Sequence, residues 1–257
     1  MLNLSPSEQR KLFSSDFGKV LLRCIKDLVF PIFWQSPDSG QWKIIDSGSG
    51  FILQIDDSIY GITAGHVMSG FECAKKNHSE ISAHLRSLEF DLQNSKITTI
   101  EENGIDISTF RISKEEKNIV GKNAHVLRST DLPLPTVAEG ERLLVCGFPA
   151  QNRHLKDQEV EFGAFMFSPP VASVGESGFY FQIEREHYVD TEGHGLPGDS
   201  GLGALSGAPV FRLSESDQGI LHKTLAGVVG SSISFGETIK ATHASVIRDG
   251  GEIVLSE

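Results

Sequence analysis

Three stretches of the sequence hold a histidine, an aspartate and a serine in settings where these side chains could perform nucleophilic catalysis. His66 lies in TAGHV, Asp106 in GIDIS and Ser206 in LSGAPV. A serine hydroxyl becomes an effective nucleophile when a neighbouring base takes its proton, and imidazole titrates in the range that suits this task. A carboxylate bonded to the imidazole fixes its tautomer and stabilises the imidazolium. The three residues could therefore form a triad for acyl transfer.

Each of the three residues also has an ordinary interpretation. The chain contains nine histidines, and most histidines are surface groups or hydrogen-bonded core groups. An aspartate in a turn can cap its own loop, although the apolar neighbours of Asp106 favour a buried carboxylate, which is costly unless bonded. The setting of Ser206 is the most specific, because Gly207 and Ala208 leave space around the hydroxyl and Pro209 directs the chain into an apolar stretch.

The elements that must position these residues have the pattern of short strands. From Val29 onward, apolar stretches alternate with Gly, Asp, Ser and Asn, which is typical of an all-β sandwich or barrel. We expect strands at residues 29–34, 42–45, 50–55, 59–63, 97–100, 107–112, 142–147, 160–167, 179–183, 208–212 and 224–229. His66 should lie at the end of the fourth of these. Residues 184–203, rich in Gly, charge and His, have the composition of a functional loop.

Before the first strand, residues 1–28 have the pattern of one amphipathic helix. Ser5 could be its N-cap and Pro6 its first helical residue. Apolar residues recur at helical spacing: Leu12, Phe13, Phe17, Val20, Leu21, Cys24, Ile25 and Leu28. We expect the helix to pack on the body of the domain; the alternative is a docking surface for a regulatory protein.

Composition excludes several classes of function. The net charge of -11 argues against a nucleic-acid partner, which needs clustered Lys and Arg. The sequence has no run of eighteen apolar residues, so we expect no membrane span. The three cysteines are widely spaced and no secretory signal is visible, which favours a reducing compartment, the cytoplasm. No metal-ligand spacing and no phosphate-binding loop is present, so we expect neither a metal nor a cofactor.

Taken together, the motifs resemble the chymotrypsin/trypsin family of serine peptidases, in particular its disulfide-free bacterial members. The resemblance rests on the order His, Asp, Ser, on GSGFIL before His66, on GFP after residue 146 and on AGVVG from residue 226. It covers roughly residues 29–247. It implies two six-stranded antiparallel barrels with the triad between them. The implied organisation is a helical extension at 1–28, a first barrel at about 29–126, a linker at about 127–141 and a second barrel at about 142–257.

The resemblance also implies roles for individual residues. Ser206 would be the nucleophile, His66 the general base and Asp106 its orienting carboxylate. The backbone N–H groups of Ala204 and Ser206 would bind the oxyanion. The substrate pocket would be lined by Asp199, Ser200, Val229 and Gly230. Two positions depart from the family: Ala204 stands where Gly is usual, and Leu205 where secreted members have the Asp that pairs with a freed N-terminus.

Two questions stay open in the sequence. The signature GDSG at residues 198–201 makes Ser200 a competitor for Ser206, although neither Pro nor a strand follows it. Asp199 could form the floor of the specificity pocket and select Arg or Lys, or lie in a solvated acidic turn, in which case Ser200 would form the floor and favour a small or apolar residue. The sequence predicts a serine endopeptidase acting on proteins or peptides; the alternative is a catalytically inactive member of the same fold that binds protein.

Overall fold

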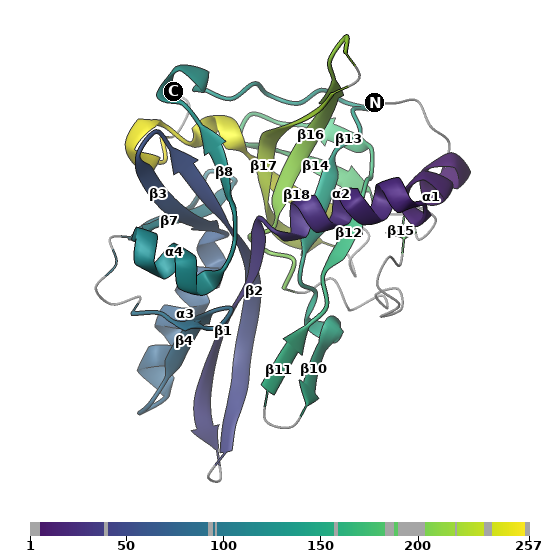
Figure 1. The fold of residues 1–257 in the computed structure, drawn as a ribbon. Coiled ribbons are helices and arrows are strands. Elements are labelled where there is room, and N and C mark those ends of the chain that lie inside the picture. Colours follow the sequence, from purple (N-terminus) through teal and green to yellow (C-terminus); the bar gives the residue numbers. More distant parts are fainter. Residues whose placement is uncertain are drawn as a thin grey trace.

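The computed structural model describes residues 6–38, 41–91, 95, 97–156, 159–182, 188–189, 204–218, 220–233 and 238–254. The chain is mostly β, with two largely antiparallel sheets side by side and two helices near the N-terminus lying across one of them (Figure 1). Apolar side chains from both sheets form one buried cluster, which includes Phe51 and Ile62 of the first sheet and Phe211 and Val228 of the second. No helix among the described residues is long and apolar enough to cross a membrane.

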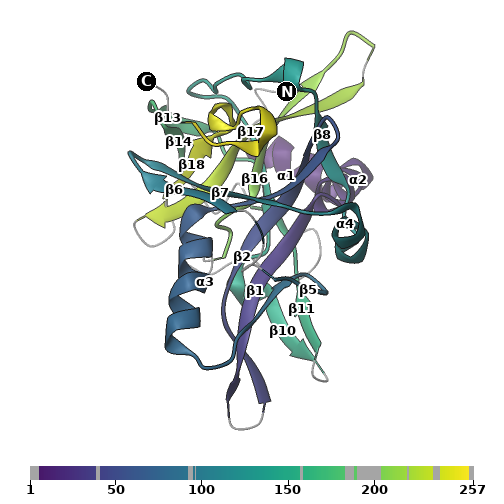
Figure 2. The ribbon, with the colours of Figure 1, turned by 90° about the vertical axis from the view of Figure 1, so that its left-hand side faces the viewer.

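The first sheet comes from residues before 128. Its strands are β1 (Val29–Asp38), β2 (Gln41–Ile55), β3 (Ser58–Thr63), β4 (Ser82–Leu85), β5 (Leu88–Glu89), β6 (Ile97–Glu102), β7 (Ile105–Arg111) and β8 (Ala124–Leu127). They lie in the order β5-β4-β1-β2-β3-β7-β6, and β8 pairs in parallel with β2. Two helices accompany this sheet, α3 (Gly65–Asn77) and α4 (Lys114–Val120). Figure 2 shows α3 beside the long β1–β2 hairpin.

The second sheet comes from residues after 143. Its strands are β9 (Leu144–Gly147), β12 (Phe165–Phe167), β13 (Val171–Val174), β14 (Gly178–Gln182), β15 (Tyr188–Val189), β16 (Pro209–Glu215), β17 (Leu221–Ile233) and β18 (Thr238–His243). Their order is β13-β14-β18-β17-β16-β9-β12-β15. A separate hairpin joins β10 (Arg153–Lys156) to β11 (Glu159–Phe162). Short 3-10 turns are η1 (Ser129–Asp131), η2 (Ala150–Asn152), η4 (Ala244–Val246) and η5 (Asp249–Gly251).

Hydrogen bonds outside the strands curl the second sheet. The Gly140 N–H donates to the Val171 carbonyl at 2.8 Å, and the Val171 N–H donates to the Glu141 carbonyl at 2.8 Å. These bonds bring the start of β13 to the chain that leads into β9, although several strands separate β13 from β9 in the sheet order. The first sheet is more open in the part of the chain that the structure describes, since β6 and β5 end its strand order without pairing with each other.

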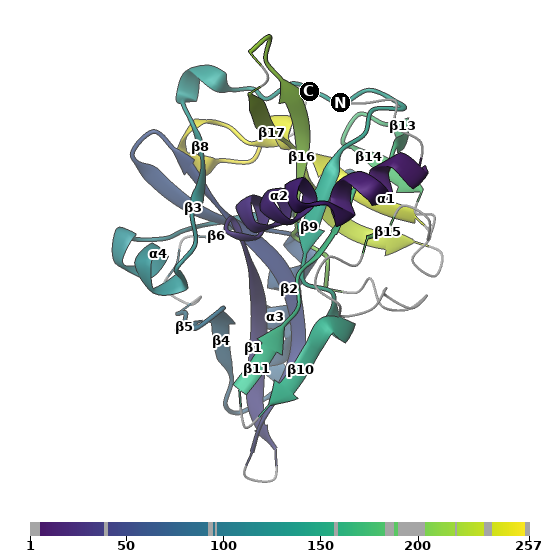
Figure 3. The same cartoon turned by 45° about the vertical axis from the view of Figure 1, so that its right-hand side comes forward.

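The N-terminal segment forms two helices, α1 (Pro6–Ser14) and α2 (Asp16–Lys26), where the sequence predicted one. Ser15 has an extended backbone and caps α2 by accepting from the Gly18 N–H at 3.4 Å. A Cβ at Gly18 would lie 2.0 Å from the Phe13 carbonyl oxygen, so the close turn requires glycine. Phe13, Leu21 and Ile25 are buried in a cluster with β9 side chains, which confirms packing on the body of the protein. Figure 3 shows α1 and α2 lying across the second sheet. Ser5, the predicted N-cap, lies outside the described residues.

Several predicted elements differ in detail. The stretches 42–45 and 50–55 belong to one strand, β2, because its hairpin with β1 continues through a bulge between Trp34 and Gln35. The stretch 160–167 is divided between β11 and β12. Each sheet has eight described strands instead of the six that the resemblance implies, since short strands such as β5 and β15 extend the edges. After β8, residues 128–141 contain one 3-10 turn, η1, and no strand; their role as a linker stays a prediction.

Candidate active site

His66 lies just after β3, in the first turn of α3. Strand β3 ends at Thr63 and α3 begins at Gly65, so the prediction that His66 ends a strand is wrong. The N-cap residue of α3, Ala64, has no side chain able to cap the helix. The Asp106 carboxylate does so instead, because its Oδ1 accepts from the His66 backbone N–H at 3.0 Å. A carboxylate is favoured at this position by the exposed N–H groups and the positive end of the helix dipole.

The same carboxylate contacts the imidazole ring. His66 Nδ1 and Asp106 Oδ2 are 2.8 Å apart. This hydrogen bond is the main cause of a raised pKa at His66 and outweighs burial, which lowers it. Burial acts to raise the pKa of Asp106, but the hydrogen bond and charge of His66, with two backbone N–H bonds, lower it. The site therefore stabilises an imidazolium–carboxylate pair and leaves Nε2 on the far side of the ring.

Asp106 also meets the second sheet. It is the second residue of β7, close to its predicted place at a strand start. The Asp106 N–H donates to Oγ1 of Thr242, on β18, at 3.0 Å. A Cβ at Gly230, on β17, would lie 3.0 Å from Asp106 Oδ2. The carboxylate is thus enclosed by both sheets, and the absence of a side chain at Gly230 leaves room for it.

Ser206 lies in the turn that precedes β16, as predicted, and is half-buried. The turn reaches the first sheet through its backbone: the Ser206 carbonyl accepts from the Ser49 N–H at 2.8 Å. Gly207 has φ 88°, and a Cβ there would lie 2.2 Å from Thr63 Oγ1 and 3.0 Å from the Ala64 N. The turn after Ser206 therefore packs directly against the two residues that lead into the histidine helix. Ser206 therefore lies near the helix that carries His66, but the described residues show no hydrogen bond between its hydroxyl and the imidazole.

The predicted oxyanion turn has an unusual backbone. Ala204 has φ 70°, a left-handed conformation that costs an L-residue about 1–2 kcal/mol. The Ala204 carbonyl accepts from the Ser49 hydroxyl at 2.8 Å. Within the described chain, neither the Ala204 N–H nor the Ser206 N–H donates to a protein acceptor. Both donors therefore remain available to a ligand oxygen, as an oxyanion site requires.

The predicted substrate pocket is only partly visible. Asp199 and Ser200 lie outside the described residues, so their roles stay predictions. Val229 is 2% exposed and packs in the core of the second sheet, so its side chain does not line a solvent-accessible pocket. The Val229 carbonyl accepts from the Gly207 N–H at 2.7 Å. Gly230 faces Asp106, as described above, and a pocket lined by the backbone of Val229 and Gly230 stays a prediction.

Sequence reasoning missed two residues that hold the site together, Ser49 and Thr242. Both are almost fully buried polar residues with partners far away in the chain. The GSG pattern around Ser49 was a usable signal, because a small polar residue between two glycines marks close approach of other backbone. Nothing in the local sequence of Thr242 indicates its contact with Asp106.

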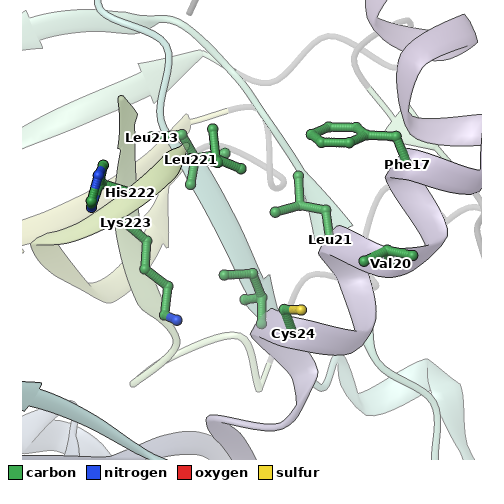
Figure 4. A pocket seen from close by; sticks show the side chains of 9 residues that line it. Phe17, Val20, Leu21, Cys24, Leu213, Leu221, His222 and Lys223 are labelled. Atoms are coloured by element: carbon green, nitrogen blue, oxygen red, sulfur yellow. The ribbon is translucent and has the colours of Figure 1, made fainter. Parts of the chain in front are cut away.

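An apolar groove lies elsewhere, between α2 and the β16–β17 hairpin (Figure 4). Its walls are Phe17, Val20, Leu21, Cys24, Ile25, Leu213, Leu221, His222 and Lys223, around a volume of about 290 Å³. Phe17 and Val20 are 44% and 54% exposed. The groove is where the predicted docking of a regulatory protein on the N-terminal segment would take place, and that docking stays a prediction.

Comparisons with known proteins gave structural likeness only. No protein-family model and no curated protein matches the sequence. One similar solved structure comes from work on the intrinsically disordered VPg protein of Sesbania mosaic virus; it is 11% identical, with a TM-score of 0.46 over 87% of this chain and 88% of that one. Another is the protease of tobacco vein mottling virus, 12% identical, with a TM-score of 0.44 over 86% of this chain and 79% of that one.

Proposed function

We propose that this chain is a serine endopeptidase of the trypsin-like kind, with Ser206 as nucleophile, His66 as general base and Asp106 as the carboxylate that orients it. The observation that carries the proposal is the double contact of Asp106 with His66, to the ring at 2.8 Å and to the backbone at 3.0 Å. This double contact supports an imidazole whose tautomer and position are set by Asp106, near the Ser206 turn. A carboxylate that served only as a helix cap would not need the ring contact.

The proposed reaction follows from these positions. Ser206 Oγ attacks the carbonyl carbon of a peptide bond while His66 Nε2 takes the hydroxyl proton. The carbonyl oxygen becomes an oxyanion, which the N–H groups of Ala204 and Ser206 would stabilise. The C–N bond breaks as the imidazolium returns its proton to the leaving amine. Water then attacks the acyl-enzyme by the same base catalysis and releases Ser206 with the second product.

We propose that the two sheets correspond to the two six-stranded barrels of that fold, with a helical extension before them. Support comes from the curl of the second sheet and from the apolar cluster shared by both sheets. The domain boundaries expected from the sequence follow from this correspondence and remain part of the proposal. A cytoplasmic location is also part of the proposal; no disulfide joins the three cysteines among the described residues, and Cys24 and Cys73 are exposed, which agrees with it.

The test is turnover of an activated ester, p-nitrophenyl acetate, by wild type and two matched variants. Ser206→Ala should remove the acylation burst and lower the rate by about 10⁴-fold or more. Ser200→Ala, the same change at the competing serine, should leave the burst in place. An inactive binding module predicts no burst in any of the three proteins, and loss of the burst in Ser200→Ala alone would transfer the nucleophile to Ser200.

A further inference from the structure

Ser49, in β2, connects the first sheet to the turn that carries Ser206. Its side chain is fully buried, with 0% exposure. The hydroxyl donates to the Ala204 carbonyl at 2.8 Å and accepts from the Phe148 N–H at 2.9 Å. A serine hydroxyl has one proton to donate, so the bond to Ala204 uses all of its donor capacity. Phe148 directly follows β9, and the hydroxyl therefore joins β2, the end of β9 and the turn at one point.

The backbone of Ser49 holds the same turn. Its N–H donates to the Ser206 carbonyl at 2.8 Å, and its carbonyl accepts from Thr63 Oγ1 at 2.7 Å. One residue therefore holds the carbonyl groups on both sides of Leu205. Thr63 is also fully buried and ends β3, three residues before His66. The nucleophile turn is thus fixed relative to the strand that leads to the proposed base.

Close packing around Ser49 leaves little space for a different arrangement. A Cβ at Gly147 would lie 2.8 Å from Ser49 Oγ, and a Cβ at Gly207 would lie 2.0 Å from the Ser49 carbonyl oxygen. Two glycines therefore allow the second sheet to approach Ser49 from both sides. The contacts form a buried polar clamp, defined by Ser49, Ala204 and Ser206.

One contact of the clamp, the bond from Ser49 to the Ala204 carbonyl, acts on a residue with an unfavourable backbone conformation. At φ 70° an alanine tends to relax to negative φ, and that rotation would reorient the peptide groups on either side of Ala204. The bond from Ser49 to the Ala204 carbonyl opposes the rotation. We propose that Ser49 is a positioning residue for the reaction proposed above: its hydroxyl holds Ala204 in the left-handed conformation and so keeps the Ala204 N–H directed at the oxyanion.

The inference rests on the proposed peptidase function, and the test separates the two. The rate of labelling by a fluorophosphonate and the kcat for p-nitrophenyl acetate are measured for wild type, Ser49→Ala and Ser47→Ala. Ser47 is a buried serine on the same strand whose hydroxyl has no bond to the turn. Ser49→Ala should lower labelling rate and kcat by about 10- to 100-fold with KM little changed, as expected for loss of an oxyanion donor. Ser47→Ala should match wild type.

A rescue variant distinguishes positioning from general destabilisation. Glycine adopts positive φ without penalty, so Ser49→Ala/Ala204→Gly should recover the rate to within about threefold of Ala204→Gly alone. The pH midpoint of kcat should stay unchanged in all variants, because none touches the His66–Asp106 pair. If Ser49→Ala does not fold, the rate of Ser49→Ala/Ala204→Gly is compared with the rate of Ala204→Gly.

Several outcomes would overturn the inference. One is a wild-type rate in Ser49→Ala. Another is a reduced fraction of active molecules with a normal rate per active site, which indicates a structural role only. A third is a large loss of rate that Ala204→Gly does not rescue. If wild type itself is neither labelled nor active, the proposed function fails, and the inference fails with it.

Discussion

The proposed acid–base half of the site, His66 and Asp106, and the proposed nucleophile half, the Ser206 turn, are held in different ways. His66 and Asp106 hold each other: one carboxylate bonds the ring and caps the helix that carries it, and both residues belong to the first sheet and its helix. The Ser206 turn is held by hydrogen bonds to Ser49 of the other sheet and to the Val229 backbone of its own sheet. The first half is therefore built for a fixed imidazole, and the second half depends on how the two sheets meet.

The largest effect should be a loss of kcat on changing the His66–Asp106 pair. Asp106→Asn keeps the size of the side chain but can favour the wrong imidazole tautomer, so kcat should fall by about 10⁴-fold. The helix cap should largely survive, since an amide oxygen can still accept from the His66 N–H. Steady-state kinetics on p-nitrophenyl acetate, with thermal unfolding as a control, provides the measurement. A loss below tenfold in a folded variant would show that Asp106 serves the helix and not the imidazole.

The next largest effect is a loss of stability on changing Gly207, in the Ser206 turn. Gly207→Ala places a Cβ 2.0 Å from the Ser49 carbonyl oxygen at a φ of 88°, so the free energy of unfolding should fall by about 3 kcal/mol or more. Gly140→Ala is the matched control, because its φ is also positive but no atom lies within 4 Å of the added Cβ. Urea unfolding compares the two variants. Equal losses would mean that backbone strain alone matters and that the contact with the first sheet is loose.

The pH dependence separates the two halves further. The pKa of His66 is raised above 6.5, mainly by its hydrogen bond with Asp106 and further by the nearby charges of Glu101 and Asp46. Because the base must be neutral, activity should rise with pH through that raised pKa, and Asp106→Asn should move the midpoint down. Stability has the opposite trend. The raised pKa of His66 adds to the free energy of unfolding below pH 6.5, and this contribution is lost as the pH rises through the raised pKa. A pH profile of kcat/KM and unfolding curves between about pH 5 and 9 test both trends; a kcat/KM midpoint below 6.5 in wild type would contradict the pairing.

The smallest effect concerns Ala204, which stands where Gly is usual in the family that the sequence resembles. Ala204→Gly relieves a left-handed alanine, and the free energy of unfolding should rise by up to about 1 kcal/mol with kcat nearly unchanged. Differential scanning calorimetry would register a small increase in Tm. A destabilised variant would indicate that the Ala204 methyl group makes packing contacts worth more than its backbone strain.

The sequence predicted the strands near the triad well because their motifs are local. Short apolar stretches located β3, β7 and β16, with Gly104 before β7 and Gly207 before β16, and so located Asp106 and Ser206. It failed at His66 because helix α3 contains few strong helix signals: glycines occur at its first and sixth positions and its cap comes from Asp106, forty residues away. The roles of Ser49 and Thr242 were equally out of reach, since each depends on a contact between the two sheets that no local pattern encodes.

The central claim is that Ser206 is the nucleophile activated by His66. Tandem mass spectrometry of the intact protein after reaction with a fluorophosphonate tests it most directly, because a phosphonate ester forms only on an activated serine and marks that residue. The account predicts one adduct per chain, on Ser206, that is lost in His66→Ala and in heat-unfolded protein. An adduct on Ser200, or labelling of Ser206 that persists in His66→Ala, would contradict it.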